Sequence, residues 1–298
     1  MPTPKQKKYT FAPMKCLFFL TCMLLCGICS GVAQVRVELS PDGPTLRPLE
    51  MSDYDRHEPA RRLTRQDSVD YSSHVARAFN YLAADSLAQA RMHLEQALRL
   101  WPEAPGTWIL RHNLGRIALA EGRHAAAYEE FTRILKKLPE ERTVRKDRAA
   151  AALELGYTRE ALEDLNLLLA NETSDSLRAS LLFMRASARM KSRLYADART
   201  DLKAVLSLQP ASENAMLLLC AVDWQSGRRE SALLMLGGFI NAHPANTLAR
   251  SMRAGFLAEQ GRTEAAILDL EDALRIEPGN LEILQQRDNI VRQQRKRK

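Results

Sequence analysis

The sequence of 298 residues predicts an all-α fold built from six consecutive helix–turn–helix repeats and a final helix. The main observation is an alanine that recurs at spacings of 34 or 37 residues, with an apolar residue four positions after each copy. The six pairs are Ala90 and Leu94, Ala127 and Phe131, Ala161 and Leu165, Ala198 and Leu202, Ala232 and Leu236, and Ala266 and Leu270. Residues four apart share one helix face, and a small residue lets two helices approach closely. The pattern therefore predicts a helix that crosses a neighbour at each alanine.

The first helix of each repeat and the turns follow the same register. A small residue lies twelve positions before each alanine, at Ala78, Gly115, Ala149, Ala186, Cys220 and Ala254. Proline, which ends the second helix, lies twelve positions after five of the alanines, at Pro102, Pro139, Pro210, Pro244 and Pro278. Glycine, which favours a left-handed turn, lies five positions before four of them, at Gly122, Gly156, Gly227 and Gly261. Asp85 and Arg193 hold this place in repeats one and four, so the sequence specifies the turn least well there.

This register closely resembles the tetratricopeptide repeat, a 34-residue helix–turn–helix unit with the same A-x3-F spacing followed by proline. The resemblance covers about residues 71–280 and implies a right-handed α-solenoid of about six repeats. The expected repeats are 71–104, 108–141, 142–175, 179–212, 213–246 and 247–280. Residues 281–298 are expected to form a capping helix with a basic tail, because an end repeat exposes an apolar face that needs cover.

Two linkers between repeats are three residues longer than the others, around 103–106 and around 171–175. The second linker also lacks the proline and has Thr173 in its place. Either the last helix of repeat three continues, or a longer loop loosens the stacking. Turn and cap residues from Asn171 to Ser176 favour the loop, which we predict to be a hinge.

The N-terminal segment reads as a secretory signal peptide over residues 1–33. Four lysines precede an uncharged apolar run from Cys16 to about Ile28, and Gly31-Val32-Ala33 then offers small residues for cleavage after Ala33. Translation from Met14 would leave a shorter signal. An uncleaved anchor and a lipoprotein are the alternatives, but the run is short for a span of about 20 residues and no cysteine follows a small residue. We expect an exported, periplasmic protein whose mature form has no transmembrane span.

Residues 34–70 are expected to form an extended leader. Val35–Leu39 alternates apolar and polar residues as a short strand does, and four prolines follow. The formal charge of +7 includes the four signal lysines, and five further positive charges lie in the last seven residues, Arg292–Lys298. Basicity is therefore local to the tail, so we expect no nucleic-acid partner. A peripheral contact between the tail and the envelope is an open alternative to a solvated helix end.

The sequence shows no constellation that indicates catalysis, a metal or a cofactor. The histidines lack metal-ligand spacing, and Cys220, the lone cysteine after the signal, holds a packing position. Three short motifs resemble the O-glycosylation site of exported Bacteroidetes proteins, but Asp or Ser before a helix is equally a cap. They begin at Asp67, Asp85 and Asp175. We therefore expect an exported, Bacteroidetes-like bacterial protein that is not an enzyme.

Function is expected on the surface, because tetratricopeptide repeats bind peptides or partner helices in a concave groove lined by their first helices. The family's groove positions correspond here to His112, Arg116, Lys146, Phe183, Met190, Leu217, Trp224 and Leu248. This groove would be basic towards its N-terminal half and apolar towards its C-terminal half, and would suit an amphipathic segment with an acidic end. The alternative is that several apolar members pack against neighbouring helices. We predict a protein-binding scaffold of the cell envelope; an outer-membrane-associated assembly factor and a regulatory subunit of an envelope enzyme complex are the rival readings.

Overall fold

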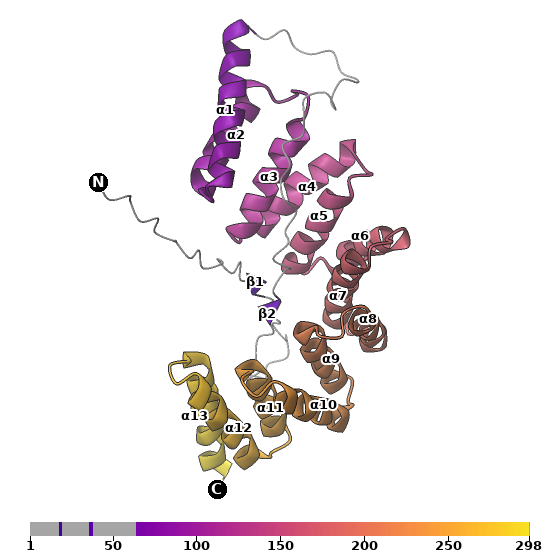
Figure 1. Ribbon diagram of the computed structural model, residues 1–298, viewed down its shortest axis with the longest axis vertical. Coiled ribbons are helices and arrows are strands. Elements are labelled where there is room, and N and C mark those ends of the chain that lie inside the picture. The colour runs from indigo at the N-terminus through magenta and orange to yellow at the C-terminus, as the bar shows by residue number, and fades with distance from the viewer. Residues whose placement is uncertain (1–17, 20–35, 38–63, 298) are drawn as a thin grey trace, which may run out of the picture.

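The computed structural model describes residues 64–297 together with the short segments 18–19 and 36–37. In residues 64–297, six helical hairpins follow one another and a thirteenth helix closes the array, so the chain is all-α as predicted (Figure 1). The helices are α1 (Arg65–Ala83), α2 (Leu87–Leu100), α3 (Thr107–Ala120), α4 (His124–Lys137), α5 (Arg142–Leu155), α6 (Thr158–Ala170), α7 (Asp175–Lys191), α8 (Tyr195–Leu208), α9 (Glu213–Gln225), α10 (Arg229–Ala242), α11 (Thr247–Glu259), α12 (Thr263–Ile276) and α13 (Leu281–Arg297).

Two strands of two residues each lie in the N-terminal part of the chain. They are β1 (Phe18–Phe19) and β2 (Arg36–Val37), paired antiparallel with Phe18 opposite Val37. Strand β2 falls within the alternating segment that was expected to be extended. Most of the predicted signal peptide, the cleavage site after Ala33 and most of the leader lie outside the described residues and remain predictions.

The alanine register is the core of the array. All six alanines and all six of their apolar partners are fully buried, at 0% exposure. The small residues of the first helices are buried as well, and Gly115 shows why they must be small. A Cβ added there would meet the ring of Phe131, with Cζ only 2.8 Å away. The helix crossings inferred from the spacing are therefore present in every hairpin.

The turn inside each hairpin has one residue in the left-handed region. Four are the expected glycines, with φ between 72° and 85° at Gly122, Gly156, Gly227 and Gly261. The other two are Asp85 at φ 54° and Arg193 at φ 61°. Repeats one and four thus make the same turn with residues whose Cβ disfavours it.

The linker between repeats three and four is a loop and not a continued helix. Helix α6 ends at Ala170, and α7 begins at Asp175 after the cap Ser174. Arg142 crosses this loop, because its Nη2 donates to the carbonyl of Leu168 at 3.0 Å and to Glu172 Oε2 at 2.7 Å. The backbone N–H of Ser174 and the guanidinium group of Arg142 both stabilise the Glu172 carboxylate, and they lower its pKa. The longer linker is therefore braced, and its role as a hinge stays a prediction.

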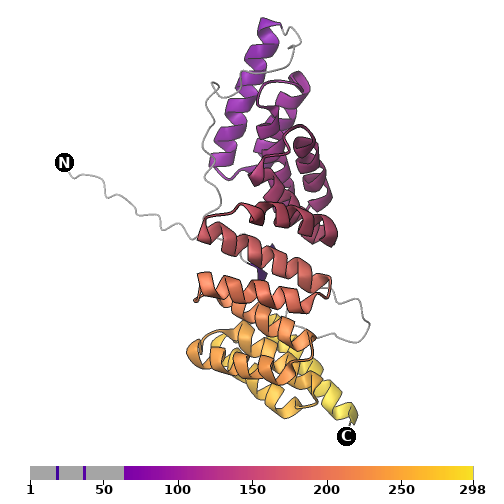
Figure 2. The same ribbon diagram turned by 90° about the vertical axis from the view of Figure 1, so that its right-hand side faces the viewer.

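The ends of the array follow from local sequence. Helix α1 begins six residues before the expected repeat boundary, at Arg65 and not at 71, because Thr64 and Asp67 form a reciprocal capping box. At the other end, α13 buries Ile283 and Ile290 against a cluster that includes Ala254 and Leu270. The final helix thus covers the apolar face of the last hairpin. Figure 2 shows the hairpins layered along the length of the molecule.

Candidate interaction surface

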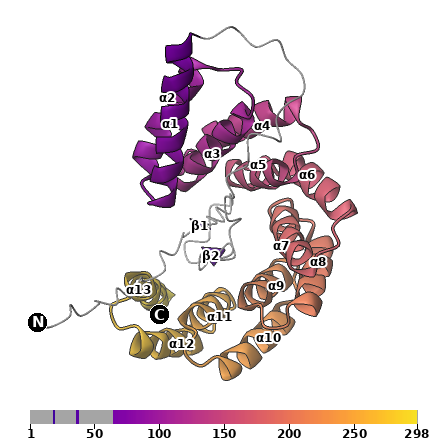
Figure 3. The same ribbon diagram turned by 45° about the horizontal axis from the view of Figure 1, so that its top comes forward.

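The hairpins curve into an arc whose inner side is formed by the odd-numbered helices α3, α5, α7, α9 and α11 (Figure 3). We call this inner side the concave wall. The even-numbered helices lie on the outside of the same arc. The eight residues predicted for the groove all belong to the helices of the concave wall, so the structure allows each to be placed.

Three of the eight predicted groove residues are buried and have partners inside the chain. His112 is 7% exposed, and its Nε2 lies 2.8 Å from Asp147 Oδ2 on the next inner helix. Leu217 is 1% exposed within an apolar cluster. Trp224 is 4% exposed, stacks on Phe256 with ring centroids 4.2 Å apart, and donates from Nε1 to Glu259 at 2.7 Å. The alternative of packing between helices holds for these three, because the next repeat covers them.

The other five predicted groove residues are half-buried. Phe183 and Met190 on α7 pack at the edge of one core cluster, and Leu248 packs at the edge of the cluster that contains Trp224. Arg116 on α3 and Lys146 on α5 make no hydrogen bond or ion pair with any residue in the described part of the chain. Two cations therefore face the N-terminal half of the concave wall, and half-buried apolar side chains face the C-terminal half.

Polar contacts between successive inner helices hold the concave wall together. Besides the bonds of His112 and Trp224, Lys191 Nζ donates to the carbonyl of Leu153 at 2.6 Å. Gln286 Nε2 of α13 donates to the carbonyl of Ser251 at 3.0 Å. Each bond joins residues 35 or 38 positions apart, about one repeat. The sequence reading missed these bonds; a polar residue one repeat after a groove position is the signal that could have found them.

Within the hairpins, buried carboxylates pair with arginines. Asp164, Asp201 and Asp269 each lie three residues after a register alanine and are at most 6% exposed. Each accepts two hydrogen bonds from the arginine thirteen residues before that alanine, at 2.5–3.0 Å: Arg148, Arg185 and Arg253, respectively. The pairing with Asp raises the pKa of Arg148 and Arg253. These pairs fasten the two helices of a hairpin and take the carboxylates away from any surface role.

Repeat one keeps an arginine at the position of the paired arginine, Arg77, but has an imidazole in place of the acid. His93 takes the place of the buried Asp, and its Nδ1 lies 2.8 Å from His74 Nδ1. Tyr81 stacks on His93 with ring centroids 5.4 Å apart. Burial lowers the pKa of His93, and repulsion from His74 and Arg77 lowers it further. The folded chain therefore favours the neutral imidazole of His93. The contribution of this group to the free energy of unfolding is complete above the ordinary histidine pKa of about 6.5, and it falls as the pH drops below that value.

Neither a metal site nor a membrane span is found in the described part of the chain. No three His, Cys, Asp or Glu side chains there are grouped to hold a metal ion. Among the described helices, none is both long and apolar enough to cross a bilayer. The tail predicted as an alternative contact begins on α13, where Arg292 is exposed and its Nη2 donates to Asn289 Oδ1 at 3.0 Å.

The fold has several solved counterparts. A tetratricopeptide-repeat protein from Parabacteroides merdae superposes with a TM-score of 0.67 at 23% identity, covering 76% of this chain and 87% of that one. The thermophilic protein TTC0263 from Thermus thermophilus gives 0.50 at 22% identity, over 62% and 98%. A chain of the Cut9–Hcn1 hetero-tetramer of APC/C gives 0.53 at 14% identity, over 76% and 46%. These likenesses establish the fold alone.

The family comparison agrees with the register. The tetratricopeptide-repeat model matches residues 75–142 and 222–280, which lie in the first two and the last two hairpins. No curated protein sequence matches the chain. The buried alanine register, the matched residues and the shared fold together show a tetratricopeptide-repeat fold, and the family model matches two segments of the chain.

Proposed function

We propose that this protein is a non-catalytic scaffold of the cell envelope that binds a segment of another protein on its concave wall. The proposal rests on the separation of cationic and apolar side chains into two halves of that wall. Arg116 and Lys146 offer cations without partners in the described chain, and Phe183, Met190 and Leu248 offer half-buried apolar surface further along. An amphipathic segment with an acidic end fits both halves at once.

Two further points support this function. Tetratricopeptide repeats bury their core between helices and leave an extended inner surface for ligands. The fold also occurs in Cut9–Hcn1, a hetero-tetramer, and hence in a chain that assembles with another protein.

The envelope location is supported by the order of basic residues, apolar run and small residues over 1–33. Exported protein should accordingly begin at Gln34 by intact mass; a start at Met1 or Met14 would contradict the location.

The binding surface is tested by capture from envelope fractions with matched variants. Phe183→Ala combined with Met190→Ala should weaken capture of the partner by roughly thirtyfold, since hot-spot truncations are worth about 2 kcal/mol. Arg116→Glu combined with Lys146→Glu should slow association and change its salt dependence. Trp224 is unsuitable for this test, because its 4% exposure means that truncation removes core packing.

Controls come from the outer helices. Leu234→Ala changes an apolar side chain that is 79% exposed on α10, and Lys136→Glu reverses an exposed charge on α4. Both should capture the partner as the wild type does. Equal capture by all groove variants would refute the concave site. Loss of capture only after removal of Arg292–Lys298 would make the tail the interface and favour an assembly or regulatory role at the envelope.

A further inference from the structure

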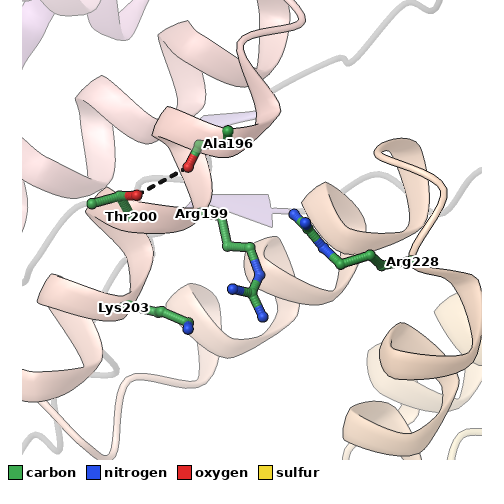
Figure 4. Close-up of a pocket in the computed structure, with 5 residues that line it drawn as sticks. All are labelled: Ala196, Arg199, Thr200, Lys203 and Arg228. Carbon is green, nitrogen blue, oxygen red and sulfur yellow. Dashed lines mark hydrogen bonds between the residues drawn. The ribbon is translucent and has the colours of Figure 1, made fainter.

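A basic cavity lies outside the concave wall, between α8 and the start of α10. Its volume is about 230 Å³. It is lined by Ala196, Arg199, Thr200, Lys203 and Arg228. Figure 4 shows the side chains of Arg199, Lys203 and Arg228 around this cavity, with Arg199 between the other two.

A buried carboxylate fixes the two guanidinium groups. Asp223 is 0% exposed, and its Oδ1 accepts from Arg199 Nε at 2.8 Å and from Arg228 Nε at 3.0 Å. Ser231 Oγ donates to the other oxygen at 3.2 Å. Both arginines use only Nε, so their Nη groups make no hydrogen bond with any residue in the described part of the chain. The two planar donor groups are thus held in place with their ends unused.

The charges around the cavity do not balance. Three cations and the one carboxylate of Asp223 leave a net formal charge of +2. The Lys203 side chain is exposed and has no partner in the described chain. Oriented guanidinium groups bind phosphate and carboxylate oxygens through paired hydrogen bonds. A space of 230 Å³ is smaller than cavities for drug-sized ligands, which begin at about 300 Å³, so it suits one small group.

We propose that this cavity binds a single doubly charged oxyanion of the phosphate class, either inorganic phosphate or a phosphate monoester. Two negative charges neutralise the excess of +2. The Nη groups of Arg199 and Arg228 donate to its oxygens, and the Lys203 ammonium closes the third side. The site lies on the outer helices, so it is separate from the proposed groove and can fail or succeed independently.

The cavity is particular to this junction of the array. One repeat later, the positions of Arg199, Lys203 and Asp223 hold Leu233, Gly237 and Leu257. Only the arginine before the helix recurs, as Arg262. Arg262 precedes α12 as Arg228 precedes α10, and it is exposed, but no buried carboxylate lies at the corresponding position. Arg262→Gln is therefore a control matched in charge and in register.

The experiment is calorimetric titration of the full mature chain with inorganic phosphate, at constant ionic strength set with sodium chloride. Wild type should bind one phosphate. Lys203→Gln should weaken binding by roughly three- to tenfold, because it removes one charge-assisted bond from an exposed side chain. Arg228→Gln should weaken it further, and Arg262→Gln should bind as the wild type does. Circular dichroism confirms that each variant is folded.

Parallel titrations separate the sources of the anion. If phosphoserine binds as tightly as phosphate, the result supports a phosphate monoester as the ligand. If phosphoserine does not bind while phosphate does, the result supports inorganic phosphate. Acetate that binds as tightly as phosphate would overturn the doubly charged ligand in favour of a carboxylate. If the Lys203→Gln variant binds phosphate as tightly as the wild type, the proposed site is wrong, even if Arg228→Gln unfolds.

Discussion

Arg193 sits in a left-handed turn without being glycine, and replacing it by glycine should stabilise the protein. An L-residue in this conformation costs about 1–2 kcal/mol, whereas glycine costs about 0.5–1 kcal/mol in lost freedom of the unfolded chain. Arg193 has φ 61° and an exposed side chain with no hydrogen bond in the described chain. Arg193→Gly should therefore raise the free energy of unfolding by about 0.5–1 kcal/mol, the difference between the two terms.

The reverse exchange serves as the matched control. Gly227 holds the same turn in the next repeat at φ 85°, and a Cβ added there meets nothing within 4 Å. Gly227→Ala should thus destabilise by about 0.5–1 kcal/mol through backbone strain alone. Asp85→Gly should gain less than Arg193→Gly, because aspartate tolerates the left-handed region better. Urea unfolding followed by circular dichroism measures all three. If Arg193→Gly is no more stable than the wild type and Gly227→Ala has an unchanged free energy of unfolding, these turns are not left-handed.

Two other predictions concern the core and repeat one. Gly115→Ala should destabilise by about 1 kcal/mol, because overpacking against Phe131 costs about 1–3 kcal/mol and the gain in helix propensity offsets about 1 kcal/mol. Gly238→Ala, whose Cβ has open space, should stabilise, and equal melting curves for the two would contradict the close crossing. Acidification from about pH 7.5 to 5.5 should destabilise wild type more than His93→Asp, because the variant replaces the neutral His93 imidazole, whose pKa is lowered, by a carboxylate next to Arg77. Parallel loss of stability in both, measured by urea unfolding at each pH, would rule out His93 as the cause.

Apolar periodicity in the sequence predicts the architecture well, because each hairpin buries the same positions. The six register alanines and their partners could be assigned to helix crossings from spacing alone, and the structure buries all of them. The loop after Ala170 could also be predicted, since its turn and cap residues interrupt the helix.

Polar positions were predicted less well. Asp164 and Asp201 look like surface carboxylates in a periodic sequence, and the structure buries them beneath arginines from the paired helix. Trp224 occupies a groove position in its own repeat, but Phe256 of the next repeat covers it. Both outcomes depend on how far a long side chain reaches and on the angle between repeats, which the pattern within one repeat does not contain.

The reactivity of Cys220 towards a thiol reagent reports on local unfolding of the fifth hairpin. The four other cysteines lie at or before Cys29, so cleavage after Ala33 would leave one thiol. Burial, with the charge of Asp223, raises the pKa of this thiol to about 12, and its exposure is 0%. A thiol reagent then reacts only in molecules whose fifth hairpin has opened. The labelling rate, compared with that of the unfolded chain, measures the free energy of local unfolding at that hairpin without any introduced probe.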